Sequence, residues 1–232
     1  MNKLLSATVA IVILSSCQSN ELKQPVAGQY ATGTFGYDLD FLRQKDSILI
    51  LNSKDGNGQV IVSPKYQAKV FTSTANGVNG KSFGWINYKA FSAKSLNPHM
   101  NAYGGEDRLW LGPEGGKFAL FFNKGAKMEI ANWHTPAAFD NEEWKLVSHT
   151  DKKASLTKFA RLVNYKGTIL TFSIGRVIQI LEPEDIIQML GINMDTKISS
   201  VAFSTINTIT NKGDKVWDKQ SGMCRVDCLL SG

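Results

Sequence analysis

Residues 104–122, GGEDRLWLGPEGGKFALFF, constrain the fold of this chain most, because acids, an arginine, a tryptophan and several glycines lie here between apolar runs. Successive side chains of a strand leave it on opposite faces. A strand that begins at Glu106 therefore carries Glu106, Arg108 and Trp110 on one face, while Asp107 and the leucines face the other way. The segment predicts a strand on which an acid, a base and an aromatic ring lie side by side.

The second half of this segment predicts a turn and then another strand. Gly112 and Pro113 interrupt a hydrogen-bonded ladder, and the Gly115-Gly116 pair allows backbone conformations that a Cβ would forbid. Glu114 is therefore expected on a shaped turn. Residues 118–122 are apolar on both faces, as in a strand that lies between two layers. We expect the polar face before this run to open at the rim of a sheet packed on a second sheet, which suits a ligand site.

Short strands separated by turn residues dominate the rest of the chain. In the strand expected at 168–181, only Arg176 interrupts the apolar face, so this arginine must find a partner or reach water. Many strands and few helices predict an all-β sandwich. The other expected strands are 47–51, 59–63, 68–74, 142–150, 155–165 and 197–207, and the expected short helices are 38–45 and 182–191.

The start of the chain has the pattern of a bacterial export signal. Lys3 precedes an apolar run that is too short to span a membrane. Residues 14–17, LSSC, match the lipobox, which predicts that Cys17 is lipidated and becomes the new N-terminus. The predicted organisation is a signal peptide at 1–16, a lipidated tether at 17–28 and a β-sandwich domain at 29–232.

The residues that follow Cys17 predict where the lipid anchors the protein. Gln18 and Ser19 are not the aspartate that is associated with retention in the inner membrane. We therefore expect an exported, lipid-anchored protein on the periplasmic side of the outer membrane or at the cell surface.

Charge and cysteine content argue against several classes of partner. The formal net charge of +6 is spread over scattered lysines, which is typical of a solvated surface, so we expect no nucleic-acid partner. Cys224 and Cys228 are too few for a metal site, and a disulfide between them has no evident purpose. The three histidines are not clustered in sequence, so we expect no metal and no cofactor.

Several blocks of the sequence resemble those of a known family. They are SILILNSKDGNGQVIVSPKYQAKVFTSTANG, SFGWIN, HMNAYGGEDRLWLGPEGGKFALFF, NWHTPAAF and VAFSTINTITN. In this order they are similar to an uncharacterised family of secreted bacterial proteins related to the galactose-mutarotase-like (aldose 1-epimerase-like) β-supersandwich. The resemblance covers nearly all of the mature chain and implies that fold. The family continues through further strands, and the residues from Met223 show no strand pattern, so we expect a supersandwich that is incomplete at the C-terminus.

The resemblance and the residue pattern together give the candidate site residues. Aldose epimerases open a sugar ring with a histidine acid and a glutamate base, so His99 and Glu114 are the catalytic candidates, with His134 as an alternative to His99. Structural roles remain open for each: a same-face ion pair for Glu106 and Arg108, core packing for the tryptophans, and an ordinary surface role for the histidines. The carbohydrate-binding candidates are Asn101, Glu106, Arg108, Trp110, Trp133 and Asn207.

Three hypotheses for function follow. The first is a membrane-anchored periplasmic lipoprotein that binds carbohydrate, either without catalysis or as a divergent epimerase-like protein. The second is a sugar-processing enzyme of the aldose 1-epimerase type that uses a His/Glu acid–base pair. The third is a truncated fragment without function, whose unpaired sheet edges would favour aggregation. The expected partners are a carbohydrate ligand and, through the lipid on Cys17, a membrane.

Overall fold

A computed structural model of the chain describes residues 29–192, 195, 197–223 and 225–230. For residues 225–230 it describes the backbone only. The predicted signal peptide, the lipidation site at Cys17 and the tether lie outside the described residues, as does Cys224.

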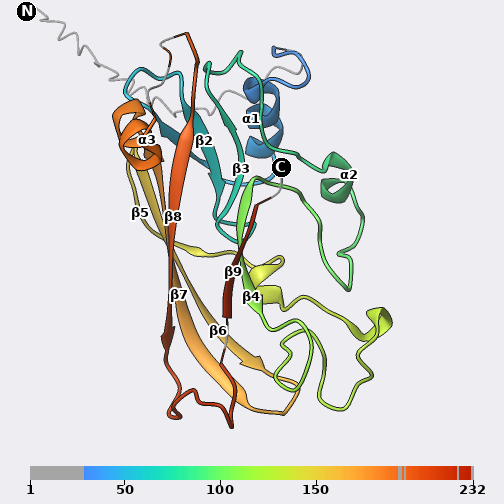
Figure 1. Ribbon diagram of the computed structural model, residues 1–232. Helices are drawn as coiled ribbons and strands as arrows, with labels where there is room; N and C mark the ends of the chain where they lie inside the picture. Colours follow the sequence, from blue (N-terminus) through green and yellow to red (C-terminus); the bar gives the residue numbers. More distant parts are fainter. Residues whose placement is uncertain (1–28, 193–194, 196, 224, 231–232) are drawn as a thin grey trace, which may run out of the picture.

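Two antiparallel sheets form the body of the protein (Figure 1). The five-stranded sheet has the order β1-β2-β3-β4-β9 and the four-stranded sheet has the order β5-β6-β7-β8. The all-β class predicted from the sequence is therefore confirmed. The strands are β1 (Leu49–Asn52), β2 (Gln59–Ser63), β3 (Lys69–Thr74), β4 (Asp107–Gly112), β5 (Lys145–His149), β6 (Lys153–Val163), β7 (Ile169–Leu181), β8 (Ala202–Asn211) and β9 (Arg225–Leu230).

The main core lies between the two sheets. Alternate residues of β7 face it, from Leu170 to Ile180, and meet Val60, Val70 and Leu109 of the other sheet. A second cluster lies on the other face of the five-stranded sheet, under the helices α1 (Phe35–Arg43) and α2 (Tyr88–Phe91). Because β3 is covered on both faces, all six of its residues are buried. The order of layers is thus helices, five-stranded sheet, four-stranded sheet.

Both expected helices form, although the first spans Phe35–Arg43 instead of 38–45 because it begins at the Thr34 cap. The Thr34 side chain accepts a hydrogen bond from the Tyr37 N–H at the start of α1, and Leu39 and Leu42 are buried as predicted. Helix α3 (Pro183–Leu190) has proline in its first turn, a capping box at its start and Gly191 in the left-handed conformation at its end. None of the helices in the described part of the chain is long and apolar enough to cross a membrane.

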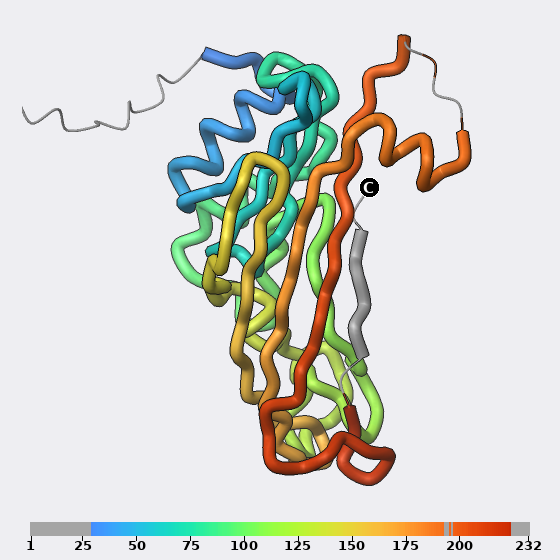
Figure 2. The backbone as a smooth tube through the Cα atoms, turned by 90° about the vertical axis from the view of Figure 1, so that its left-hand side faces the viewer, coloured from blue at the N-terminus to red at the C-terminus, as the bar shows by residue number. Residues whose placement is uncertain are grey.

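The long strands give the protein two distinct ends. Figure 2 shows β6, β7 and β8 running the length of the molecule, with α3 at one end and the loop after β8 at the other. Two short 3₁₀ helices, η1 (Ile130–Asn132) and η2 (Ala137–Phe139), lie in the long connection between β4 and β5.

The expected strand at 118–122 does not form. These residues are bends and turns, although residues 119–122 are buried as predicted. Their backbone bonds to several separate segments: the Leu120 N–H donates to the Pro113 carbonyl, and the Phe121 carbonyl accepts from the His134 N–H. Both edges of β4 are already paired, with β3 and with β9, so the apolar run cannot join that strand. It fills the core as an irregular segment whose backbone hydrogen bonds go to loops.

The prediction that no strand follows Met223 was also wrong. Residues 225–230 form β9, which pairs antiparallel with the whole of β4, from Asp107 opposite Leu230 to Gly112 opposite Arg225. The exposed backbone edge of β4 supplies the ladder that the sequence pattern did not reveal.

Candidate functional site

Part of the face predicted for residues 106–111 is present on β4, where Arg108 and Trp110 lie on the same side of the strand. The Arg108 guanidinium carbon lies 4.4 Å from the centroid of the Trp110 ring, within the range of a cation–π contact. The Trp110 Nε1–H donates to Glu114 Oε1 at 2.7 Å. Trp110 is buried, Arg108 is half-buried and Glu114 is exposed. The turn at residues 112–116 thus brings the Glu114 carboxylate back to the strand that it follows.

A row of aromatic rings extends from Trp110 to Trp133. The Phe121 ring centroid lies 5.1 Å from that of Trp110 and 5.2 Å from that of Trp133, and the Phe121 and Trp133 rings are parallel to within 11°. Phe139 closes the row from the side, 5.9 Å from Trp110. Trp133 is half-buried, so the row reaches the surface at this end. Trp110 itself packs in the core, which was the alternative left open for it.

The two candidate histidines form a pair beyond Trp133. The rings of His99 and His134 are stacked, with centroids 5.0 Å apart and planes within 12°. His99 Nδ1 lies 2.6 Å from the Trp133 carbonyl oxygen, and His134 Nδ1 lies 2.7 Å from the Pro98 carbonyl oxygen. A carbonyl oxygen only accepts, so in the neutral rings each Nδ1 carries the hydrogen and each Nε2 has the free lone pair.

Arg108 presents a cation beside the aromatic row. Its Nη1 and Nη2 atoms lie 3.9 and 3.8 Å from the sulfur of Met100. Burial lowers the pKa of Arg108, while the charges of Asp140 and Glu114 raise it. Among the side chains that the structure describes, no carboxylate lies within ion-pair distance of this guanidinium. Its N–H donors are therefore suited to a ligand that accepts hydrogen bonds.

Lys69 is a buried cation near Arg108 that the sequence did not reveal. Its Nζ donates to the Gly104 carbonyl at 2.7 Å, and the residue is only 3% exposed. Its pKa is lowered to about 7, first by burial and then by the Arg108 charge, while the Asp140 charge opposes both. Gly105 makes room for the side chain, since a Cβ there would lie 2.5 Å from Lys69 Cδ. The sequence pattern gave no reason to expect Lys69 to be buried, because lysines are usually exposed.

Asn101 has a structural role instead of facing a ligand. It is buried, its backbone N–H donates to Asp140 Oδ1 at 2.9 Å, and its side-chain Nδ2 donates to Asp140 Oδ2 at 2.6 Å. The same Asn101 side chain accepts from the Asn97 N–H. This network ties the loop that carries His99 to the segment after η2. Asn101 therefore positions the histidine pair from below the surface.

Two other candidates lie away from the Arg108 surface. The Glu106 carboxylate accepts from the backbone N–H of Ser73 at 2.6 Å and from its hydroxyl, and burial raises the pKa of Glu106. The same-face ion pair of Glu106 with Arg108 does not form. Asn207 Oδ1 accepts from Arg176 Nη1 at 2.8 Å on the opposite side of β4, where Arg176 binds Asp107.

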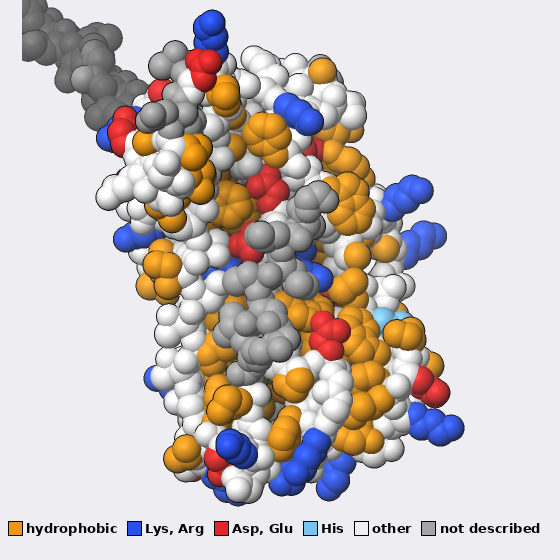
Figure 3. All heavy atoms as spheres, viewed as in Figure 1, with side chains coloured by type: hydrophobic (Ala, Val, Ile, Leu, Met, Phe, Trp, Pro, Cys, Tyr) orange, Lys and Arg blue, Asp and Glu red, His pale blue; other side chains and the backbone are white. Residues whose placement is uncertain are grey.

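The candidate site is therefore a surface made by Arg108, Glu114, Trp133, His99 and His134, which we call the Arg108 surface. Trp110 and Trp133 are more than twenty positions apart in sequence. They are connected here because the buried segment 118–122 places the Phe121 ring between them. In the space-filling view, hydrophobic side chains cover much of the lower half of the face shown, with acidic and histidine side chains beside them (Figure 3).

The family is decided by the match of residues 33–230, which span most of the chain, to a family described as of unknown function, DUF6786. The chain belongs to DUF6786. The sequence matches none of the curated proteins with which it was compared.

Two solved structures share part of the architecture with this DUF6786 member. One is a protein of Escherichia coli K12 described as a possible aldose 1-epimerase, with 13% identity and a TM-score of 0.32, over 59% of this chain and 42% of that chain. The other is the Slr1438 protein of Synechocystis sp. PCC 6803, with 15% identity and a TM-score of 0.32, over 58% of this chain and 48% of that chain. The matched part is thus less than half of either protein. At these TM-scores the likeness says nothing about site or activity.

The residues that the structure describes in this DUF6786 member contain no group of three or more His, Cys, Asp or Glu side chains placed to hold a metal ion. The Arg108 surface offers one cation, one carboxylate, two imidazoles and an aromatic ring.

Proposed function

We propose that the protein is a lipid-anchored carbohydrate-binding protein that holds its ligand on the Arg108 surface. The observation that carries this proposal is the placement of the Arg108 guanidinium and the Glu114 carboxylate on the same tryptophan, Trp110. One group donates hydrogen bonds, the other accepts them, and both are fixed by the ring between them. The half-buried ring of Trp133 lies further along the same row.

A sugar fits this combination of groups because it has two kinds of surface. Its hydroxyls donate and accept hydrogen bonds, which suits a guanidinium beside a carboxylate. Its ring also presents C–H groups that pack on aromatic side chains, as amphipathic ligands do in pockets of mixed character. The proposed ligand packs on Trp133, where the aromatic row reaches the surface, and its hydroxyls extend toward Arg108 and Glu114 or toward the histidine pair.

The anchoring part of the proposal rests on the lipobox at residues 14–17. Lipidation of Cys17 would leave residues 18–28 as a tether between the membrane and the β-domain. One acyl chain binds a membrane only marginally, but the several chains of a bacterial lipoprotein give stable anchoring. The location follows as the periplasmic side of the outer membrane or the cell surface.

An epimerase-like activity is the second candidate, and the histidine pair favours it. Because the Nδ1–H groups of His99 and His134 are held by carbonyl oxygens, their Nε2 atoms face away as proton acceptors. Ring opening of a sugar hemiacetal needs one proton delivered to the ring oxygen and one removed from the anomeric hydroxyl. A histidine with Glu114 would supply these two functions.

The binding proposal is tested by thermal unfolding of the full-length chain, purified in a nonionic detergent, with a panel of neutral mono- and oligosaccharides. We expect one class of sugar to raise the transition, because a ligand at 100 times its Kd adds about 2.7 kcal/mol to the native state. Arg108→Gln and Glu114→Gln should each weaken binding at least tenfold, whereas Glu143→Gln, at an exposed position in another segment, should not. A panel without any stabilising sugar would contradict the proposal.

Polarimetry of freshly dissolved α-D-galactose and α-D-glucose separates the two candidates. An epimerase would speed the change in optical rotation, and Glu114→Gln and His99→Ala would abolish that acceleration while sugar binding remained. If the wild type does not speed the change in optical rotation and Glu114→Gln loses sugar binding, the protein binds carbohydrate without catalysis.

Anchoring is tested by expressing the wild type and Cys17→Ala with labelled palmitate. We expect label and membrane association for the wild type and neither for Cys17→Ala. Membrane association that is equal in the two would overturn the lipid anchor.

A further inference from the structure

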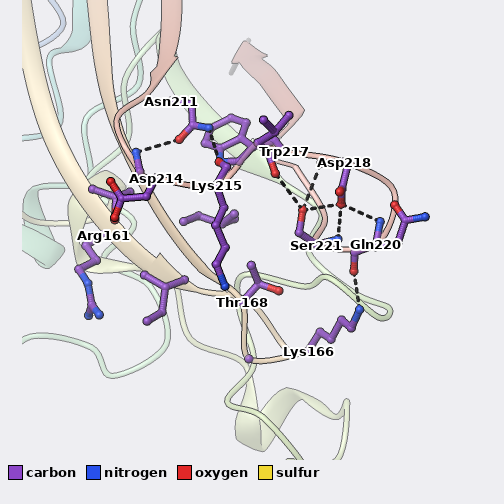
Figure 4. A pocket seen from close by; sticks show the side chains of 16 residues that line it. Arg161, Lys166, Thr168, Asn211, Asp214, Lys215, Trp217, Asp218, Gln220 and Ser221 are labelled. Carbon is purple, nitrogen blue, oxygen red and sulfur yellow. Dashed lines mark hydrogen bonds between the residues drawn. The ribbon is translucent and has the colours of Figure 1, made fainter.

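A cavity of about 690 Å³ is lined by none of the residues of the Arg108 surface (Figure 4). The loop after β8, which forms part of its wall, lies at the end of the molecule opposite α3 (Figure 2). Its walls come from three segments: the end of β6 with the turn into β7, the first residues of β7, and the loop at 211–221 after β8. A volume of this size is within the range of small-molecule sites. Nothing in the proposed function uses this cavity.

Three cations line the cavity. Arg161 comes from β6, Lys166 from the turn and Lys215 from the loop (Figure 4). Lys166 Nζ is held by the Gln220 carbonyl at 2.5 Å. In the part of the chain that the structure describes, the side chains of Arg161 and Lys215 have neither an ion-pair partner nor a hydrogen-bond acceptor. Two cations are thus available to a ligand.

The lining also holds two acids, which offset part of this charge. Asp218 is committed to its own loop: its Oδ1 accepts from the backbone N–H groups of Gln220 and Ser221, at 2.9 and 2.6 Å, and from the Ser221 hydroxyl. These bonds lower the pKa of Asp218 and keep it ionised. Asp214 is the other acid, and it lies on the exposed part of the loop. The lining holds three cations against two acids, one of which is already satisfied.

Some backbone amides of the loop are already used within it. Phosphate sites in loops use convergent backbone N–H groups. Here the N–H groups of Gln220 and Ser221 point to Asp218, and that of Gly213 donates to Asn211 Oδ1 at 2.9 Å. A guanidinium such as that of Arg161 matches a carboxylate in two-point geometry, so a carboxylate is the anion that the side chains of this cavity suit.

The rest of the lining suits a sugar ring. Thr168 and Thr171 supply hydroxyls, and Trp217 supplies an aromatic ring that packs edge-on against the core residue Phe172, with centroids 5.8 Å apart. We propose that this cavity binds an acidic saccharide, with the sugar carboxylate at Arg161 and Lys215 and the ring against Trp217. The site is separate from the Arg108 surface and does not depend on the function proposed for it.

The test is calorimetric titration of the full-length chain in a nonionic detergent at low ionic strength. Three probes separate the features of the ligand: tri-galacturonic acid, the neutral trisaccharide maltotriose, and tricarballylate, which has three carboxylates and no sugar. We expect tri-galacturonic acid to bind and the other two to bind at least tenfold more weakly. Added salt should weaken binding, because the cations are exposed.

Variants then assign the binding to the cavity. Arg161→Gln with Lys215→Gln should weaken tri-galacturonic acid binding at least tenfold. Arg43→Gln with Lys89→Gln, which removes the same charges from exposed positions on α1 and α2, should leave binding unchanged. Far-ultraviolet circular dichroism checks that each variant is folded.

Three outcomes would overturn the proposal. Absence of binding by the wild type would remove the site. Equal weakening in both double variants would show a general effect of charge. Equal affinity for tricarballylate would show a site for simple carboxylates and not for a saccharide.

Discussion

Asp107 and Arg176 form an ion pair between the two sheets, with 2.5 Å between Oδ2 and Nη2 and with both side chains buried. Arg176 also donates from Nε to the Ala68 carbonyl at 2.9 Å and from Nη1 to Asn207 Oδ1 at 2.8 Å. One guanidinium thus joins β7 to β4, to β8 and to the residue before β3. The alternation of β4 that turns Arg108 toward the surface turns Asp107 toward this partner.

Removal of one member of this pair should be strongly destabilising. Arg176→Met leaves a buried carboxylate without its cation, and Asp107→Leu leaves a buried guanidinium without its anion. We expect either change to lower the free energy of unfolding by about 3–5 kcal/mol. The double variant should lose less than either single variant, because two apolar side chains leave no charge uncompensated. Urea unfolding followed by circular dichroism measures all three, and single-variant losses below about 1 kcal/mol would contradict the prediction.

Lys69 should make stability depend on pH above neutrality. Its pKa is about 7 in the folded protein and 10.5 as the ordinary value, so between these values the unfolded chain binds more protons than the folded one. The free energy of unfolding should therefore rise with pH from about 7 toward 10, by up to ~1.4 kcal/mol per pH unit from this group. Above pH 10 the trend should reverse, because burial raises the pKa of Tyr66 to about 12.

Urea unfolding at several pH values tests the role of Lys69. Lys69→Met should be more stable than the wild type at pH 6–7 and should lose the rise between pH 7 and 10. Lys89→Met, at an exposed position of α2, should keep the profile of the wild type. A rise that persisted in Lys69→Met would assign it to other groups.

Gly104 should tolerate no side chain, although Gly115 in the same motif should. Gly104 has a φ of +88°, and a Cβ there would lie 2.1 Å from the Trp85 carbonyl oxygen, so the backbone itself would have to move. Gly115 has open space around the position of a Cβ. We expect Gly104→Ala to cost about 2–4 kcal/mol and Gly115→Ala less than about 1 kcal/mol. Similar losses for the two variants, measured by urea unfolding, would show that the close approach at Gly104 is not limiting.

Local patterns predicted the elements of the fold well, because their causes are local. The alternation in β7 also predicted that Arg176 needs a partner, although the identity of Asp107 depends on a contact 69 positions away in sequence. The strand expected at 118–122 and the strand missed at 225–230 fail for the same reason. Apolar content shows that a segment is buried, but whether it pairs depends on which sheet edge is free, and that is set by the whole topology.

The candidate site was predictable only in part. Arg108, Trp110 and Glu114 are close in sequence, so a strand followed by a glycine turn was enough to place them together. The stacking of His99 on His134 depends on two loops 35 positions apart, and each ring is held by a carbonyl of the other loop. Lys69 and the basic cavity at Arg161 and Lys215 had no signal, since isolated lysines and arginines are normally solvated.

Substitution of Asn101 tests whether its buried hydrogen bonds position the loop that carries His99. Asn101→Ala removes the bond from Nδ2 to Asp140 Oδ2 and leaves that buried oxygen unsatisfied, so we expect a loss of about 1–3 kcal/mol in the free energy of unfolding. Asn123→Ala, at an exposed position, should cost much less. In two-dimensional NMR the ring signals of His99 and His134 should shift in Asn101→Ala and stay in place in Asn123→Ala, because Asn101 bonds to Asp140 and to the loop that carries His99, whereas the Asn123 side chain is exposed. Unshifted histidine signals in Asn101→Ala would mean that the carbonyl bonds of the rings are sufficient to hold the pair.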